Sequence, residues 1–397
     1  MIVCAPHLGL RPGSDLGGEV SERALLERLA LAGDTIQLLL PPEAEAGPAP
    51  PGWRVRRWSR RRARRWWRSN GAAARAMDEA FREQPFDLAH VHSGLHFGRG
   101  ALAARRRLRA RFPIVVHHHH LEGSLLERTL EAAACRGADA VVVPSRFAAQ
   151  SLAEAGGPGG AGTVVIPRGV DLPDGAGREG RAPRPARDGL RRPEGRRVIL
   201  SIGRLIPRKN PLLLVEALAA VERAQPGAAC LRLLGAGPLQ RSLARRARTL
   251  GIAPLVELPG RCDAERKWRE LRACAVFATA SDLEGFGLAA AEAMAAGAPV
   301  VAPRAAAFPE LIEDGRSGLL VAPGDAHALA ATFILLLNNP GKAEALGAAA
   351  ARRVATEFSW DTAARRLRSL YQELTLSMAF SGAAARRAAV AGSPPAP

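Results

Sequence analysis

The sequence predicts an α/β protein built from two doubly wound parallel-sheet domains. Short apolar runs that suit strands alternate with helical patterns, as in parallel sheets covered by helices on both faces. A segment rich in Pro, Gly and Arg, residues 173–197, interrupts this alternation, which then starts again. The length of 397 residues is enough for two domains with a large core.

The first domain is expected over residues 1–175. Its predicted strands are residues 2–5, 35–40, 88–92, 113–117, 140–143 and 163–166. A loop with several glycines, Gly13 to Gly18, follows the first strand and leads into a helix. A strand, a glycine loop and a helix in this order form the first unit of a doubly wound sheet.

A linker over 176–197 separates this domain from the second, expected over 198–358. The strands of the second domain are predicted at residues 198–202, 230–234, 255–258, 276–279, 300–302 and 318–321. A closing helix over 359–378 is expected to pack back on the first domain, and the low-complexity tail 379–397 is expected to be disordered. Two such sheets facing each other would form a cleft, with ligands at the carboxyl ends of the strands.

Composition indicates a cytoplasmic globular protein. No apolar run approaches the roughly 18 residues that span a bilayer, and no secretory signal is visible at the N-terminus. The five cysteines are scattered without metal-type spacing, which favours free thiols in a reducing compartment. The formal net charge of +18 comes almost wholly from arginine, since only Lys209, Lys267 and Lys342 are lysines.

The most informative stretch is Glu284 to Glu292. Two carboxylates lie eight residues apart, with a glycine-containing turn and the predicted start of a helix between them. Free backbone N–H groups at a helix N-terminus bind phosphate or sugar oxygens, while carboxylates accept hydrogen bonds from hydroxyls. This combination suits a sugar attached to a phosphate.

The order and spacing of this stretch and of its neighbours resemble the family 4 retaining glycosyltransferases, which have the GT-B fold. The matching segments are Glu284–Glu292, 296–302, 309–312, 318–325 and the run Ser201–Asn210. The resemblance implies transfer of a sugar from a nucleoside diphosphate donor, with no metal cofactor. It implies that Arg204 and Lys209 bind the donor diphosphate and stabilise the charge that develops on it.

The resemblance also implies roles for the carboxylates and for the loop between them. Glu292 would bind the donor ribose. Glu284 and the backbone amides of Phe286, Gly287 and Leu288 would hold the hydroxyls of the sugar. The nucleotide base is expected near Arg261 and Cys262.

Residues of the first domain complete the predicted site. Gly17 and Gly18 resemble the glycine pair whose backbone approaches the donor phosphates and the acceptor, where a side chain would interfere. In the quartet His117–His120, His119 falls at the family's active-site histidine. Metal binding by the quartet is disfavoured, because neighbours on an extended strand point to opposite faces. His92 either lines the acceptor cleft or is a structural histidine.

The segment Trp53–Arg68 is unusually basic and aromatic. Residues 54–68 contain nine arginines and no acid, and the neighbourhood holds four of the six tryptophans. One interpretation is a helical element that docks on an anionic membrane surface and reaches a lipid-linked acceptor. A solvated arginine-rich helix and an RNA-binding segment are the alternatives.

The sequence therefore predicts a cytoplasmic retaining glycosyltransferase that is peripheral to the inner face of a membrane. Its expected partners are a nucleoside diphosphate sugar and a glycan or lipid-linked acceptor of envelope, polysaccharide or glycolipid synthesis. The alternatives are a degenerate GT-B protein retained as a membrane- or partner-binding module, and a nucleic-acid-binding protein.

Overall fold

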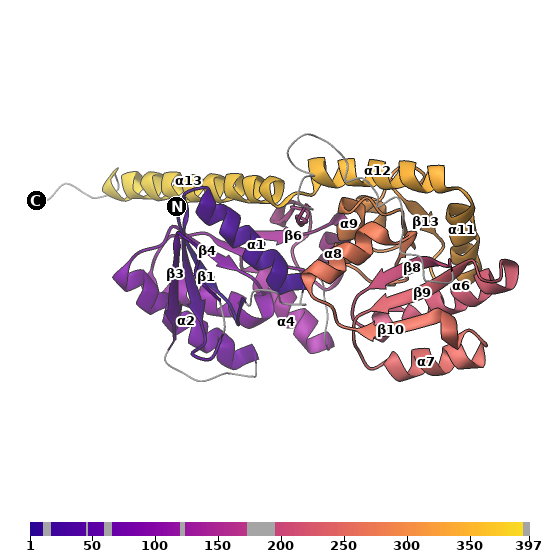
Figure 1. Cartoon of the computed structure of the whole chain (residues 1–397). Coiled ribbons are helices and arrows are strands. Elements are labelled where there is room, and N and C mark those ends of the chain that lie inside the picture. Colours follow the sequence, from indigo (N-terminus) through magenta and orange to yellow (C-terminus); the bar gives the residue numbers. More distant parts are fainter. Residues whose placement is uncertain (11–16, 45–46, 59–65, 120–123, 173–194, 392–397) are drawn as a thin grey trace, which may run out of the picture. The chain divides into compact units, whose positions relative to one another are not determined.

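The computed structural model describes residues 1–10, 17–44, 47–58, 66–119, 124–172 and 195–391. Unit 1 comprises Met1–Pro167 and Ala363–Pro397, and unit 2 comprises Arg168–Thr362. Most of the predicted linker, 176–197, lies outside the described residues. Each unit is an α/β layer structure with a single parallel sheet (Figure 1).

Unit 1 is built on a seven-stranded sheet with the order β3-β2-β1-β4-β5-β6-β7. Its strands are β1 (Ile2–Pro6), β2 (Thr35–Leu40), β3 (Trp53–Arg57), β4 (Leu88–Val91), β5 (Ile114–His117), β6 (Ala140–Val143) and β7 (Thr163–Val165). Its helices are α1 (Gly17–Leu31), α2 (Trp66–Glu83), η1 (Gly94–Gly98), α3 (Arg99–Leu108), α4 (Leu125–Arg136), α5 (Arg146–Glu154) and η2 (Gly160–Gly162). All strand pairs are parallel.

Unit 2 is built on a six-stranded parallel sheet with the order β10-β9-β8-β11-β12-β13. Its strands are β8 (Arg197–Ile202), β9 (Ala229–Leu234), β10 (Val256–Gly260), β11 (Val276–Ala278), β12 (Val300–Pro303) and β13 (Leu319–Val321). Its helices are η3 (Pro207–Lys209), α6 (Pro211–Ala224), α7 (Gln240–Thr249), η4 (Ala253–Leu255), α8 (Ala264–Ala273), α9 (Leu288–Ala295), α10 (Phe308–Leu311), α11 (Ala326–Asn338) and α12 (Pro340–Glu357).

The central strands are buried along their whole length because helices cover both faces of each sheet. All four residues of β5, β6 and β12 are buried, and so are those of β4. Several helices begin at a polar residue whose side chain accepts a hydrogen bond from the first turn, as Ser124 does for α4 and Asp263 for α8. The sequence predictions of α/β class and parallel sheets are confirmed.

The basic segment is not one helix. Trp53–Arg57 forms β3, an edge strand that pairs with β2, and the next described helix, α2, begins only at Trp66. Trp53 and Trp58 are 8% and 7% exposed, because they pack into unit 1. The helical interpretation is therefore wrong for residues 53–58. Residues 59–65, which include several of the arginines, lie outside the described residues.

The last helix, α13 (Trp360–Ala391), is longer than the predicted 359–378. The alanine-rich sequence after residue 381 has high helix propensity, which favours continuation of the helix over a tail without structure. Tyr371 of this helix is fully buried in unit 1. Among the helices that the structure describes, none is both long enough and apolar enough to cross a bilayer.

Candidate active site

The sequence-predicted site residues gather at one topological position in each sheet. In unit 1 the strand order reverses between β1 and β4, and in unit 2 it reverses between β8 and β11. The crevice outside the carboxyl ends of such strands is where doubly wound sheets bind ligands. The loops that leave these ends carry His92 in unit 1 and Arg204, Lys209 and Glu284 in unit 2.

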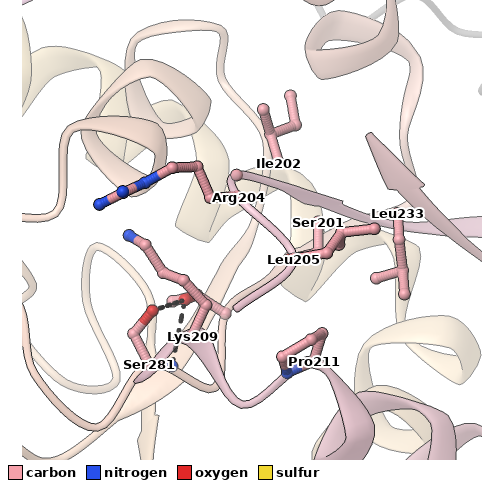
Figure 2. Close-up of a pocket in the computed structure, with 10 residues that line it drawn as sticks. Ser201, Ile202, Arg204, Leu205, Lys209, Pro211, Leu233 and Ser281 are labelled. Carbon is pink, nitrogen blue, oxygen red and sulfur yellow. Dashed lines mark hydrogen bonds between the residues drawn. The ribbon is translucent and has the colours of Figure 1, made fainter. Parts of the chain in front are cut away.

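In unit 2 the loop from β8 to α6 lines a small pocket (Figure 2). Its lining residues are Ser201, Ile202, Gly203, Arg204, Leu205, Lys209, Pro211, Leu233, Thr279 and Ser281. Arg204 and Lys209 extend to the same side of the pocket. Ser281, across the pocket, is tied to Thr279, with 3.3 Å between their hydroxyl oxygens. Two cations beside hydroxyl groups form a site suited to phosphate oxygens.

Gly203 and Gly235 make this close loop packing feasible. Gly235 has a φ of 144°, and a Cβ there would lie 1.9 Å from the carbonyl oxygen of Gly203. No side chain fits in that space, so the loop after β9 can approach the loop after β8 only with glycine at this position.

Lys209 forms an ion pair and hydrogen bond with Oε1 of Glu284. Arg208, whose role the sequence analysis missed, donates to the carbonyl oxygen of Leu283 at 2.7 Å and has Nη1 3.7 Å from Oε2 of Glu284. The side chain of Glu284 is only 13% exposed. The carboxylate is therefore held by two cations from η3, at the strand end where the pocket lies.

The turn after Glu284 depends on Gly287. This residue has a φ of 91°, in the left-handed region, and caps α9. Phe286 turns its side chain into the core, where its ring lies 5.7 Å from that of Phe358. Leu288 is the first residue of α9, so the N–H groups of this turn have no partners within the helix. The turn thus offers backbone donors next to a carboxylate, as the sequence predicts.

Glu292 lies inside α9 and contacts a lysine that the sequence analysis did not assign to the site. Lys267 of α8 donates to Oε1 of Glu292 at 2.6 Å. Burial raises the pKa of the Glu292 carboxyl, and the charge and hydrogen bond of Lys267 oppose this effect. The rarity of lysine in the chain, which drew attention to Lys209, was an equally good signal for Lys267.

In unit 1, α1 begins at the glycine pair. Gly17 is its first residue, and a Cβ on Gly18 would lie 3.6 Å from Nε2 of His92. His119 follows β5, and its Nε2 lies 3.1 Å from Nδ1 of His92. His92 Nδ1 is in turn 3.0 Å from Oε2 of Glu22, a buried residue of α1 that sequence reasoning missed. The glycine pair, His92 and His119 thus meet at one sheet edge.

Two groups in unit 1 have metal-ligand spacing among the described residues. The ligand atoms of Glu22, His90 and His117 lie within 4.8 Å of one another, and so do those of Glu22, His92 and His119. His120 lies outside the described residues. Hydrogen bonds already join the members of each group through Glu22 or Tyr371. These bonds use the same ring nitrogens and carboxylate oxygens that could hold an ion.

Comparisons with known proteins connect this geometry to a family. The model described as Glycosyltransferase Family 4 matches residues 17–173, and that described as Glycosyl transferases group 1 matches residues 184–353. A GDP-mannose-dependent alpha-(1-6)-phosphatidylinositol monomannoside mannosyltransferase of Mycolicibacterium smegmatis is 33% identical, over 67% of this chain and 71% of that protein. A D-inositol 3-phosphate glycosyltransferase of Kineococcus radiotolerans is 33% identical, over 73% and 72%.

Solved structures share the fold. A sucrose-phosphate synthase from Thermosynechococcus elongatus matches with a TM-score of 0.76 and 24% identity, over 95% of this chain and 99% of that chain. Anabaena HepE, in complex with UDP-glucose, matches with a TM-score of 0.71 and 21% identity, over 94% and 100%. The family resemblance and the fold are both confirmed. The chain belongs to glycosyltransferase family 4, and it is a glycosyltransferase of the GT-B fold.

Proposed function

We propose that the protein transfers a sugar, with retention of configuration, from a nucleoside diphosphate donor to a glycan or lipid-linked acceptor. The observation that supports this most directly is the grouping of Arg204, Lys209 and Glu284 at the strand ends of unit 2. Fixed cations stabilise a departing diphosphate because its negative charge grows in the transition state.

Each residue of unit 2 has a distinct part in this proposal. Arg204 and Lys209 bind the diphosphate. Glu284, which orients Lys209, accepts hydrogen bonds from sugar hydroxyls together with the amides of the Gly287 turn. Glu292 binds the ribose, since a carboxylate has about four lone-pair positions and Lys267 occupies one of them. Arg261 and Cys262, which follow β10, are assigned to the base.

The proposed reaction is a same-face displacement. The bond between the anomeric carbon and the diphosphate oxygen breaks, and the bond between that carbon and the acceptor oxygen forms on the same face. The acceptor hydroxyl gives its proton to the departing diphosphate, so the step balances without a protein nucleophile. His119 contacts the reacting sugar and its leaving phosphate. Water exclusion around the donor suppresses hydrolysis.

For the acceptor we propose a glycolipid or a glycan. The support is that one relative is named for phosphatidylinositol monomannoside and another for inositol 3-phosphate. Both names describe a polyol hydroxyl close to a phosphate. A lipid-linked acceptor would bring the enzyme to the inner face of a membrane, and this location is part of the proposal.

We propose that the arginine-rich part of the basic segment, residues 59–68, holds the protein at anionic lipid. Trp53 and Trp58 do not contribute, because both are buried. Each basic residue near such a surface contributes about 1 kcal/mol. Changing Arg60, Arg61 and Arg62 to Ser should weaken flotation with anionic liposomes, whereas the same change at the exposed Arg241, Arg245 and Arg248 of α7 should not. Equal flotation of both variants would refute this proposal.

A panel of UDP-, GDP- and ADP-sugars tests the enzymatic proposal. Thermal shift reports which nucleotide binds, and slow donor hydrolysis reports whether the bound sugar is activated. We expect one nucleotide to stabilise the protein and its sugar conjugate to be hydrolysed slowly. If no nucleotide stabilises the protein, the proposed function is wrong and a degenerate binding module is the better description.

A further inference from the structure

A hydrogen-bonded network of six side chains runs through unit 1: Glu22, His90, His92, His117, His119 and Tyr371. Its centre is the Glu22 carboxylate on α1, which is 1% exposed. Oε1 of Glu22 contacts Nε2 of His90, and Oε2 lies 3.0 Å from Nδ1 of His92. Nδ1 of His90 contacts the hydroxyl of Tyr371, and Nδ1 of His92 lies 3.1 Å from Nε2 of His119. The network therefore extends from α13 to the predicted active-site histidine.

The charge of Glu22 is well supported in this buried position. Burial raises the pKa of its carboxyl, but the interactions with His90 and His92, hydrogen bonds among them, outweigh burial and hold the pKa well below its ordinary value. An ionised carboxylate only accepts hydrogen bonds. Both imidazole nitrogens that face Glu22 must consequently carry protons.

This condition fixes the tautomers along the network, with hydrogens assigned from the hydrogen bonds. His90 has its proton on Nε2, so its Nδ1 accepts from Tyr371. Tyr371 can donate because burial raises its pKa well above the ordinary value and keeps it protonated. Its oxygen also lies 3.3 Å from Nε2 of His117. Both ring nitrogens of His90 and the hydroxyl of Tyr371 then have partners of the correct type.

The second branch leads to His119. His92 carries its proton on Nδ1, directed at Glu22, and this leaves Nε2 as the acceptor nitrogen on the side of Gly18. Since the Nδ1–H of His92 also faces Nε2 of His119, His119 presents a lone pair there and carries its own proton on Nδ1. One carboxylate thereby sets the orientation and tautomer of two histidines at the edge of the sheet.

We propose that Glu22 is a positioning residue for sugar transfer, which acts through His92 to fix the orientation and tautomer of His119. The inference rests on the proposed function, because it takes His119 as the residue that contacts the reacting sugar. Glu22 itself touches neither donor nor acceptor in this scheme. It determines which nitrogen of His119 faces the reaction.

The variant Glu22→Gln tests this with little change of shape. Its amide has one oxygen and one NH2 group, so it can accept from only one of His90 and His92, and the other imidazole must change tautomer. We expect kcat to fall by about 10- to 100-fold, since small misplacement of a reacting group costs this much. The KM for the donor and nucleotide affinity should remain within about twofold, as the residues assigned to the diphosphate and the ribose lie in unit 2.

Glu131→Gln is the matched control. Glu131 also bridges to a buried histidine of unit 1, with Oε1 3.2 Å from Nδ1 of His118, but it has no contact with His92 or His119 among those the structure describes. We expect its kcat to stay within about threefold of wild type. If both variants lose activity equally, Glu22 has only a structural role and the inference is overturned.

Imidazole 15N NMR of the wild-type protein gives a test that does not depend on activity or on the folding of a variant. We expect the Nδ1–H tautomer at His92 and the Nε2–H tautomer at His90, and a changed tautomer at one of them in Glu22→Gln. The opposite tautomers in the wild type would overturn the inference even if transfer is observed. Absence of transfer with every donor, together with the expected tautomers, would instead refute the proposed function.

Discussion

Lys267 of α8 donates a hydrogen bond of 2.6 Å to Glu292 of α9, so two neighbouring helices of unit 2 fix the carboxylate that we assign to the ribose. Burial raises the pKa of this carboxyl. An ionised carboxylate in a site that disfavours its charge lowers the stability of the fold. A role in binding a ligand would explain why the chain has a glutamate at this position.

Glu292→Gln should therefore stabilise the protein at neutral pH while it weakens nucleotide binding. A raised pKa in the folded state means that the contribution of Glu292 to stability is fully present below its unfolded pKa of about 4.5. That contribution is lost as pH rises through the folded value. The Tm of Glu292→Gln should exceed that of wild type by a margin that grows between pH 4 and 7. A constant margin would contradict the role of this titration.

Lys209→Met should reduce kcat/KM by about 100- to 1,000-fold, the usual effect of removing one group that stabilises transition-state charge. Steady-state kinetics with the donor identified by the nucleotide panel would measure it. Arg246→Met is the control, because Arg246 forms an exposed ion pair with Glu216 at 3.0 Å. Such surface pairs contribute about 0–1 kcal/mol to stability. Similar losses in both variants would indicate a general effect of charge removal.

Gly287→Ala should destabilise the protein by more than the roughly 1–2 kcal/mol cost of a left-handed non-glycine residue. A Cβ at Gly287 would lie 2.8 Å from Cε1 of Phe308, so a clash adds to the strain. Gly315→Ala separates the two causes: its φ is 77°, and nothing lies within 4 Å of the added Cβ. Urea unfolding of both variants measures the difference. Equal losses would show that Phe308 moves away at no cost.

Trp58→Ala should lower the free energy of unfolding by about 3–5 kcal/mol, as expected for truncation of a large buried ring. Its flotation with anionic liposomes should be unchanged, since the ring packs in the core of unit 1. Loss of flotation by a variant that is still folded would restore Trp58 to the membrane-binding element.

Treatment with EDTA, followed by gel filtration into metal-free buffer, should leave the transfer rate within about twofold of the untreated enzyme. The reason is that the cations that stabilise the departing diphosphate in our proposal are Arg204 and Lys209. Loss of activity that returns with added Zn²⁺ or Mg²⁺ would show that a metal takes part. The Glu22, His92 and His119 group would then be the first place to look for it.

The strands were accessible to sequence reasoning, with the exception of the edge strand β3. Every predicted strand has a counterpart whose bounds differ by at most two residues, because buried parallel strands are short, continuous apolar runs. β3 was missed since three of its five residues are arginines, Arg54, Arg56 and Arg57, which lie at the edge of the sheet. There their guanidinium groups bond to Gln84, to Glu83 and to loop carbonyl oxygens.

The candidate site was predictable where one local motif carried it. Arg204, Lys209, Glu284 and Glu292 stand in runs of fixed spacing. The structure places Arg204, Lys209 and Glu284 in segments that follow strand ends and Glu292 inside α9, and their roles stay predictions. Glu22 and Lys267 lie outside any such motif, although the rarity of lysine singles out Lys267. Each is a single charged residue in a helix, and only the tertiary structure shows that its partner is a buried histidine or carboxylate.

Tyr371 has a consequence for how the chain is made. It lies in the last helix and is fully buried in unit 1, and its hydroxyl donates a hydrogen bond to Nδ1 of His90. During synthesis the ribosome releases the strands of unit 1 first, but the residue that completes their interior follows more than 200 residues later, after the whole of unit 2. Until translation has almost ended, the nascent first unit therefore lacks the hydroxyl that pairs with Nδ1 of His90.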